Sequence, residues 1–464
     1  MNPYVAPVGS GAQMHALIGE LFPVCRSITG DGFRDSLRRL ARIAPIALTE
    51  VPSGTQVFDW TVPNEWNIRD AWIKDPTGRR VVDFRDSNLH VVSYSTPVHA
   101  RMSLADLRPH LHSRPDQPDV IPYRTSYYSE DWGFCLSHRA LESLPDGEYE
   151  VCIDSSLKPG HLTYGECVLP GISTDEILIS IHSCHPSLAN DNLSGMVVGA
   201  HLSRVLADLP RKHTIRILFI PGTIGSITWL ARHESDARRI RHGLVLSCLG
   251  DRGDSTYKRS RRGSAMVDRA AAHVLRIAGK HTILDFVPYG YDERQYCSPG
   301  FDLPVGCLTR TRNGEYPEYH TSSDNIDFVD AESLEDSLTK VLAIIEVLEC
   351  DRTYLNLSPK GEPQLGRRGL YRNTGGSSPA GFEMALLWVL NMSDQRHSLL
   401  DIAELASMSF STVRAAADAL REAALLRVID REPPHRPRAD TPSSVEAFPR
   451  SILARSGGSS DSLL

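Results

Sequence analysis

Short apolar segments alternate with helical patterns between residues 120 and 360, and few folds accommodate such an order. Strands are expected at 149–153, 177–181, 214–220, 243–248 and 305–308, and helices near 193–208, 225–233, 265–279 and 330–350. Strand–helix alternation is typical of a mostly parallel sheet with helices on both faces. The sequence therefore predicts the α/β fold class for this part of the chain.

The stretch 177–195 concentrates residues that carry chemistry. The β-branched apolar run 177–181 reads as a buried strand, ends abruptly in polar residues, and is followed by a helical pattern from residue 193. His185 and Asp191 are thus expected on a loop at the edge where open α/β sheets bind ligands. An imidazole and a carboxylate can converge on one cation, and zinc takes both ligand types. The alternative is that Asp191 is only a helix N-cap.

A second polar loop follows the strand at 305–308 and contains His320. Asp-Asn-x-Ser-Gly at 191–195 and Tyr-His-Thr-x-x-Asp at 319–324 resemble two signature segments of the co-catalytic zinc aminopeptidase superfamily. That superfamily also contains glutaminyl cyclases and the inactive transferrin-receptor ectodomain. More narrowly, the chain resembles bacterial aminopeptidase-like proteins of polysaccharide and natural-product clusters. The supporting segments are 23–31, 121–128, 257–260, 292–300 and 362–366, within a resemblance that covers roughly residues 10–430.

The resemblance implies a zinc-aminopeptidase-type sheet and a catalytic zinc site. Such a site needs three protein ligands and an open position. His185, Asp191 and His320 form the expected set, because Asp191 matches the aspartate that bridges both metals in two-zinc relatives and His320 matches their final histidine.

The second metal site of the two-zinc relatives is incomplete in this chain. Their last metal-binding aspartate should follow the strand near 243–248, where Ser247 and Cys248 stand instead. Asp251 lies four residues after Ser247 and is the nearest carboxylate in the sequence. We therefore expect one zinc ion per chain.

A further departure concerns the general base. The two-zinc enzymes carry a Glu-Glu pair after the strand that matches 214–220, and narrow-family members keep Pro-Glu-Thr there, whereas this chain has Pro221, Gly222 and Thr223. Gly222 thus marks a vacated glutamate position, so that activity is expected to be weakened or altered, unless Glu293 serves as the base. A general base contributes about 10²–10⁴-fold to rate, so Gly222→Glu is expected to raise turnover.

The resemblance also implies a substrate pocket. Its candidate residues are Arg124, Tyr127, Tyr128, Asp292, Arg294 and Tyr319. An arginine in such a pocket would hold the carboxylate of a small amino-acid-like or peptide-like ligand in a bidentate manner. The alternative for these tyrosines and arginines is a place in the core or on the rim.

The chain changes character on both sides of the α/β region. Short strand-like runs broken by turns indicate a β-rich insert at 49–119, which leaves 1–48 and 120–360 for the catalytic domain. A helix-turn-helix followed by a strand is typical of a winged-helix domain, expected at 361–431. Residues 432–464 are rich in Pro, Arg, Ser and Gly and are expected to be disordered.

Composition limits the partners. The formal net charge of −7 offers no general attraction to nucleic acid or to membrane. The expected recognition helix offers Arg414, with Arg421 just beyond it, beside acidic Asp418 and Glu422, which is a poor basic footprint. We therefore expect no nucleic-acid partner, and we assign this domain a packing or dimer role within a homo-oligomer.

Targeting signals point to the cytoplasm. The sequence has no apolar run of 18 residues, and its first residues lack the basic and apolar regions of a signal peptide. Its nine cysteines are scattered and form no Cys-x-x-Cys. We expect a cytoplasmic protein that is not associated with a membrane.

The leading functional hypothesis is a zinc-dependent, aminopeptidase-like hydrolase that acts on a small peptide or amide. One alternative is a catalytically degenerate binding or assembly protein, which Gly222 favours and the retained ligand set opposes. Another is a non-hydrolytic acyl-transfer or cyclisation enzyme of a biosynthetic pathway. A DNA-binding regulator with an enzyme-derived sensor is a third, which the weak basic footprint opposes.

Overall fold

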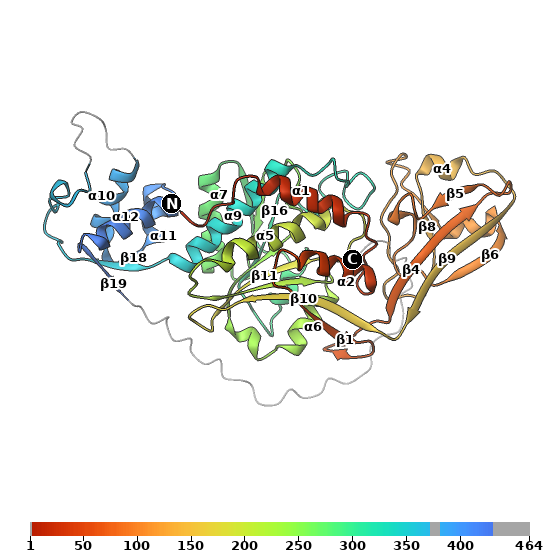
Figure 1. The fold of residues 1–464 in the computed structure, drawn as a ribbon, viewed down its shortest axis with the longest axis horizontal. Helices are drawn as coiled ribbons and strands as arrows, with labels where there is room; N and C mark the ends of the chain where they lie inside the picture. Colours follow the sequence, from red (N-terminus) through yellow and green to blue (C-terminus); the bar gives the residue numbers. More distant parts are fainter. Residues whose placement is uncertain (1, 372–380, 430–464) are drawn as a thin grey trace.

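The computed structural model describes residues 2–371 and 381–429, which form three parts in a row (Figure 1). A β-rich insert lies at one end, an α/β domain in the middle and a winged-helix domain at the other end. The tail expected at 432–464 lies outside the described residues.

An eight-stranded mixed sheet forms the centre of the α/β domain, with the order β1–β10–β12–β11–β13–β16–β14–β15. Its strands are β1 (Ala47–Pro52), β10 (His161–Leu169), β11 (Glu176–His182), β12 (Thr214–Ile220), β13 (Ile240–Leu246), β14 (Ser255–Lys258), β15 (His281–Leu284) and β16 (Val305–Thr309). The four central strands, β12, β11, β13 and β16, are parallel. Strands β1 and β10 pair in antiparallel fashion, and β14 is antiparallel to β16 but parallel to β15. The mixed, mostly parallel core expected from the sequence is confirmed.

Helices cover both faces of this sheet. They are α1 (Ser10–Leu21), α2 (Asp31–Leu40), α5 (Gly195–Ala207), α6 (Ile224–Arg232), α7 (Met266–Ala278) and α9 (Ala331–Cys350). Because β11 leads through α5 to β12, and β12 leads through α6 back across β11 to β13, right-handed crossovers place α5 and α6 on opposite faces. Helices α1, α5, α7 and α9 pack together on the α5 side.

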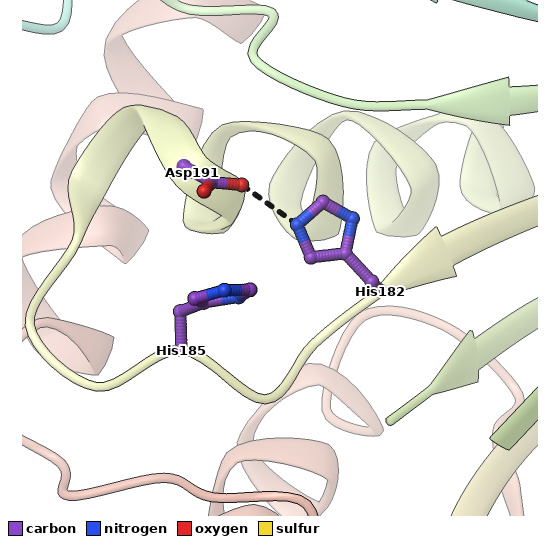
Figure 2. Close-up of side chains that lie close together, drawn as sticks. All are labelled: His182, His185 and Asp191. Carbon is purple, nitrogen blue, oxygen red and sulfur yellow. Dashed lines mark hydrogen bonds and ion pairs between the residues drawn. The ribbon is translucent and has the colours of Figure 1, made fainter. Parts of the chain in front are cut away.

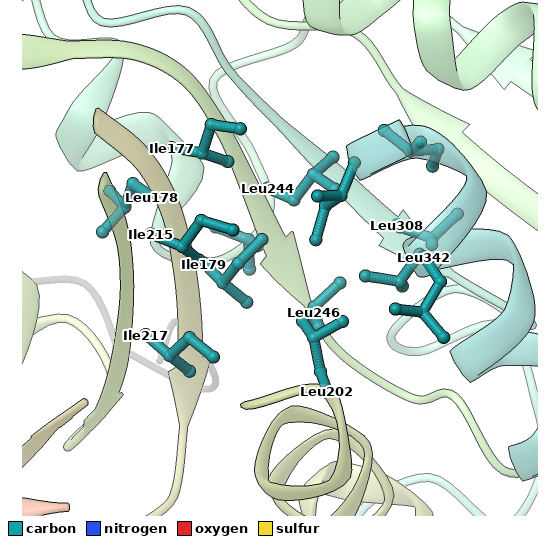
Figure 3. Close-up of a cluster of buried hydrophobic side chains, with 14 of the residues drawn as sticks. Ile177, Leu178, Ile179, Leu202, Ile215, Ile217, Leu244, Leu246, Leu308 and Leu342 are labelled. Carbon is teal, nitrogen blue, oxygen red and sulfur yellow. The ribbon is translucent and has the colours of Figure 1, made fainter. Parts of the chain in front are cut away.

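The core explains why β11 stands at the centre. All seven of its residues are buried, because helices cover the sheet on both sides. Figure 3 shows its isoleucines beside those of β12, and Leu246 of β13 against Leu202 of α5. A continuous β-branched run such as Ile177–Ile181 suits this environment, since every residue, whichever face it points to, meets apolar neighbours.

The insert is larger than the sequence predicted. Its four-stranded sheet has the order β5 (Arg80–Asp83), β4 (Glu65–Lys74), β9 (Glu148–Lys158) and β6 (Val98–Ser103). The expectation that 149–153 belongs to the central sheet was therefore wrong, and the insert extends past 119 as far as Lys158. Alternate residues of β9 are buried, the pattern of a sheet with one solvated face rather than of a fully buried parallel strand.

The winged-helix domain contains the expected helices and two more strands than expected. It consists of β17 (Thr353–Asn356), α10 (Gly381–Met392), β18 (Asp394–Ser398), α11 (Leu399–Ala406), α12 (Phe410–Glu422) and β19 (Leu426–Ile429). Strand β17 pairs with both β18 and β19, so the domain begins before the expected boundary at 361. This strand follows α9 almost directly and is only four residues long, too short to signal a new domain by itself.

Arg414, one of the two arginines of α12 that would face nucleic acid in a recognition helix, points into the protein instead. Arg414 forms an ion pair with Glu346 of α9 (3.1 Å) and donates to Cys350 Sγ (3.3 Å) and to Asn2 Oδ1 (3.1 Å). The N-terminus accordingly lies beside the winged-helix domain (Figure 1). Across residues 2–371 and 381–429, no helix is long and apolar enough to cross a membrane.

Candidate metal centre

The centre lies at the carboxyl end of β11. This strand ends in His182, a loop carries His185, and a kinked turn at Ala189–Ser194 presents Asp191 before α5 begins. The chain passes from β11 to β12 on one side of β11, and then from β12 back across β11 to β13 on the other side, where β16 is the next strand of the sheet. The site therefore occupies the topological switch point, where open α/β sheets leave a crevice for ligands.

Four side chains converge there. One ligand atom from each of His182, His185 and Asp191 lies within 4.8 Å of the others (Figure 2). His182 Nε2 is 2.7 Å from Asp191 Oδ1, and His320 Nε2 is 3.0 Å from Asp191 Oδ2. The imidazole rings of His185 and His320 have centroids 5.1 Å apart. Asp191 thus lies at the middle of a ring of three imidazoles, which is a donor set suited to a transition metal.

The electrostatics favour a cation at this point. Burial lowers the pKa of His185 to about 3, so its imidazole is neutral and has a free lone pair at ordinary pH. Burial by itself would raise the pKa of Asp191, but the electrostatic interaction with the neighbouring His185 ring and hydrogen bonds from His182 and His320 hold it well below its usual range. A neutral imidazole beside an ionised carboxylate is the protonation state that metal binding requires.

The loop that carries Asp191 is held from below by Asp324. The backbone N–H groups of Asn190 and Asp191 donate to its two carboxylate oxygens at 2.6 and 3.0 Å. Burial raises the pKa of Asp324 to about 8. The neighbouring Asn192 donates to the carbonyls of His182 and Leu246, and the Asp191–Asn192 peptide bond is cis. These contacts fix the direction of the metal-facing carboxylate.

Arg26, from the loop between α1 and α2, holds the other side of the site. It is 1% exposed and donates from Nε to the carbonyl of His185 (3.1 Å) and from Nη1 to that of Leu21 (2.6 Å). Burial lowers the pKa of its guanidinium to about 10. The segment 23–31 therefore contributes to the site by positioning His185.

Aromatic rings enclose the imidazoles. Tyr319 stacks on His320 with a centroid separation of 4.0 Å, and Tyr291 stacks on His182 at 3.7 Å. Tyr123 meets both His185 and His320 edge-on, at 5.1 Å each. The centre is thus lined by phenol rings that restrict how the imidazoles rotate.

Tyr291 also fills the space beside Gly222. The glycine follows β12 directly, and a Cβ atom added to it would overlap the Tyr291 hydroxyl and lie 2.7 Å from Cε1 and 2.8 Å from Cζ of that ring. Contacts this short require the ring or the turn to move. A glutamate at residue 222 would therefore need the Tyr291 ring or the turn to move, and the gain expected from Gly222→Glu stays a prediction.

The two acidic residues after Tyr291 both bond to the surrounding turns, although Oδ2 of Asp292 has no hydrogen-bond partner among the described residues. Asp292 Oδ1 accepts from the Thr223 N–H and from Ser226 Oγ, at 2.8 Å each, and burial raises the pKa of Asp292 to about 6. Glu293 is fully buried, forms an ion pair with Lys258 and accepts the Tyr291 N–H. The carboxylates of both residues thus hold the surrounding turns together, and Glu293 lacks the unengaged carboxylate expected of a base.

The remaining substrate-site candidates lie farther out. Tyr127 hydrogen-bonds through its hydroxyl to that of Tyr123 and so reaches the centre through one neighbour. Tyr128 is 43% exposed and packs edge-on against Trp60 of the insert. Arg124 is exposed and Arg294 is half-buried. Of the six predicted pocket residues, Tyr319 and Asp292 reach the centre directly. Tyr319 stacks on His320, and Asp292 bonds to the turn that contains Gly222.

Three residues of the centre were not predicted. His182 ends the apolar strand, and a histidine at the carboxyl end of a central parallel strand is the signal that could have identified it. Tyr123 lies within the segment 121–128, which resembles the bacterial aminopeptidase-like proteins. Nothing in the sequence pairs Tyr291 with Gly222. Asp251, considered for a second metal, instead accepts hydrogen bonds from Asn190 and Thr311.

Comparison with known proteins agrees with this architecture. Residues 15–351 match the family described as "Domain of unknown function (DUF4910)", and residues 352–428 match a winged helix-turn-helix family. A Clostridium acetobutylicum protein is 49% identical over 422 residues, which cover 90% of this chain and 97% of the relative. Its name describes a polysaccharide biosynthesis protein with an aminopeptidase-like domain.

Solved structures give the same fold. The crystal structure of a C. acetobutylicum protein whose name describes a peptidase matches this chain with a TM-score of 0.85 at 47% identity. The match covers 91% of this chain and 98% of that one. BSAP, a zinc aminopeptidase from Bacillus subtilis, has a TM-score of 0.53 at 15% identity and covers 73% and 95%. The α/β part therefore has an aminopeptidase-like fold, and the C-terminal part is a winged helix.

Proposed function

Since the chain belongs to the DUF4910 family and has an aminopeptidase-like fold, we propose that its centre binds one zinc ion and hydrolyses the amide bond of a small peptide or amino-acid-derived substrate. The observation that carries the proposal is the convergence of His182, His185 and His320 on the carboxylate of Asp191. The expected ligand set is thereby widened by His182.

The residues present fit such an ion. Zinc prefers imidazole nitrogen and carboxylate oxygen in a compact cluster, and the buried ligand atoms of His182, His185 and Asp191 already lie within 4.8 Å of one another. Bound zinc supplies Lewis-acid chemistry toward a carbonyl oxygen or a water molecule. Asp191 provides the negative charge, and Asp324 and Arg26 keep the ligand-bearing loops in place.

The surroundings support a small substrate and slow turnover. The phenol rings of Tyr123, Tyr291 and Tyr319 leave little room beside the imidazoles, so a compact group enters more readily than a folded chain. Glu293 is engaged by Lys258 and residue 222 has no side chain, so neither position offers a free carboxylate as a general base, and the remaining acidic candidate is buried Asp292, whose Oδ2 has no hydrogen-bond partner among the described residues. Loss of a general base lowers rates by about 10²–10⁴-fold.

The winged-helix domain is proposed to stabilise the catalytic domain rather than to bind nucleic acid. This proposal is supported by the ion pair that Arg414 forms with buried Glu346 inside the protein. A basic side chain paired in this way is not available to a phosphate.

The test combines metal analysis with an amide-hydrolysis screen. Purified protein supplied with zinc should hold one ion per chain, and His182→Ala and His185→Ala should each weaken zinc binding by about 100-fold or more, since even outer-shell changes cost 10–100-fold. His99→Ala, at an exposed position in the insert, is the matched control and should bind normally. Protein that takes up no zinc, or two ligand variants that bind as wild type does, would overturn the proposal.

A second candidate is a zinc-containing binding protein without turnover. The observation that favours it is the phenol of Tyr291 in the space beside Gly222. Full zinc occupancy together with no hydrolysis of any amide in the screen would select this candidate over the hydrolase.

A further inference from the structure

Tyr291 occupies a space that a side chain at residue 222 would otherwise enter. Its ring lies over His182 at 3.7 Å with an interplanar angle of 29°. On its other side, a Cβ atom at Gly222 would lie 2.7–2.8 Å from two ring carbons. The phenol therefore separates one metal-facing imidazole from the turn at which relatives of this fold were expected to carry a carboxylate.

The loop that carries Tyr291 is fixed by a buried ion pair. The backbone N–H of Tyr291 lies 3.2 Å from each carboxylate oxygen of Glu293, and that carboxylate pairs with Lys258. Lys258 Nζ also donates to the carbonyl of Tyr289 (2.7 Å). Gly290 has a φ of +153°, and a Cβ atom there would overlap both Glu293 Oε1 and Lys258 Nζ. A glycine is needed for the chain to pass so close to this ion pair.

The turn at Gly222 is held by the residue next to Tyr291. Asp292 accepts hydrogen bonds from the Thr223 N–H and from Ser226 Oγ. Thr223 has a φ of +60°, which a β-branched residue adopts only where its surroundings enforce it. Three consecutive residues thus hold the phenol and the glycine turn against each other, so the contact between Tyr291 and Gly222 is a built feature of the site.

We propose that Tyr291 closes the position from which residue 222 could supply a ligand for a second metal ion, an inference that rests on the zinc centre proposed above. With the phenol in place, residue 222 cannot direct a carboxylate toward His182 and Asp191, and the second ion that such a carboxylate would bind is excluded. Gly222 and Tyr291 then act as a pair, and a carboxylate introduced at 222 becomes a ligand only when the phenol is removed.

The experiment compares zinc stoichiometry in six forms of the full-length chain, measured by titration against a chromophoric chelator and by the absorption spectrum of bound cobalt(II). Wild type, Tyr291→Ala and Gly222→Glu should each bind at most one ion per chain. Gly222→Glu/Tyr291→Ala should approach two. Gly222→Glu/Tyr291→Phe should stay at one, because the overlapping ring carbons remain. Tyr289→Ala, 67% exposed on the same loop, controls for changes in the loop itself.

Thermal unfolding tests the steric contact without any metal. Gly222→Ala should lower Tm by about 5 °C in the Tyr291 background through overpacking. It should lower Tm much less in the Tyr291→Ala background, because the space is then open. Such non-additivity is expected only when two residues share a contact.

The outcomes separate the two proposals. Wild type without any zinc would refute the proposed function. A folded Gly222→Glu variant that binds two ions, or a folded double variant that stays at one, would refute the role of Tyr291 and leave the single-zinc centre standing. If the glutamate variants do not fold, additive Tm changes in the alanine cycle would refute the steric contact on which the inference depends.

Discussion

Removing the cation from the buried Lys258–Glu293 pair should strongly destabilise the protein. The side chain of Glu293 is 0% exposed and that of Lys258 is 11% exposed, so Lys258→Met would leave a carboxylate buried without a counter-charge. Breaking one side of a buried pair costs about 3–5 kcal/mol. The lost hydrogen bond to the Tyr289 carbonyl acts in the same direction.

The assay is urea unfolding at neutral pH, followed by circular dichroism. Lys258→Met/Glu293→Gln should recover most of the loss, because the uncompensated charge is then gone and the glutamine can still accept the Tyr291 N–H. Lys280→Met, at an exposed position, is the matched control and should change the free energy of unfolding by no more than about 0.5 kcal/mol.

Two results would contradict this reasoning. One is a Lys258→Met variant that loses less than about 1 kcal/mol, which is the behaviour of an exposed ion pair. The other is a double variant that is less stable than either single variant, since that would mean that the two side chains do not stabilise each other.

The remaining predictions concern the junction with the winged-helix domain. Burial raises the pKa of Asp351, which accepts the Leu400 N–H, to about 6. The folded protein therefore binds more protons than the unfolded chain between about pH 4 and 6, and this carboxyl makes stability fall as pH rises through that window. Asp351→Asn should flatten that fall in urea midpoints, and an unchanged slope would count against it. Arg414→Ala should lower stability by about 3–5 kcal/mol, because buried Glu346 loses its partner, and wild type should give no sequence-selective gel shift at physiological salt. A nanomolar, selective shift would show that the domain reads DNA.

Sequence patterns predicted the α/β domain well because its strands are buried on both faces. The apolar, β-branched run Ile177–Ile181 is typical of a central strand, and the sequence predicted three of the four converging side chains, those of His185, Asp191 and His320. Strand β9 was assigned to the wrong sheet because only its length and apolar residues were considered. Its alternating burial, with Tyr149 and Val151 inward, marks a sheet with one solvated face.

The parts of the centre that escaped prediction depend on contacts between distant segments. His182 contributes because the last residue of β11 points to the face of the sheet on which Asp191 lies. A shift of the strand by one residue would turn this side chain away from Asp191. Tyr291 and Gly222 are 69 positions apart and meet only because Asp292 joins their two loops. Periodicity and motif spacing describe residues that are close along the chain. Neither could show that the phenol of Tyr291 fills the space beside Gly222, where a glutamate was expected.

The contact between the first residues and α12 has a consequence for the order of synthesis. Asn2 donates to Glu346 and accepts from Arg414, a residue 412 positions later. At about 5–20 residues per second, a ribosome needs about 20–80 s to make the chain between them. During that interval the N-terminal segment has no arginine to pair with. Helix α12 therefore completes the binding site of a segment that was made much earlier, and a nascent chain that stalls before α12 leaves Asn2 and Glu346 without their arginine partner.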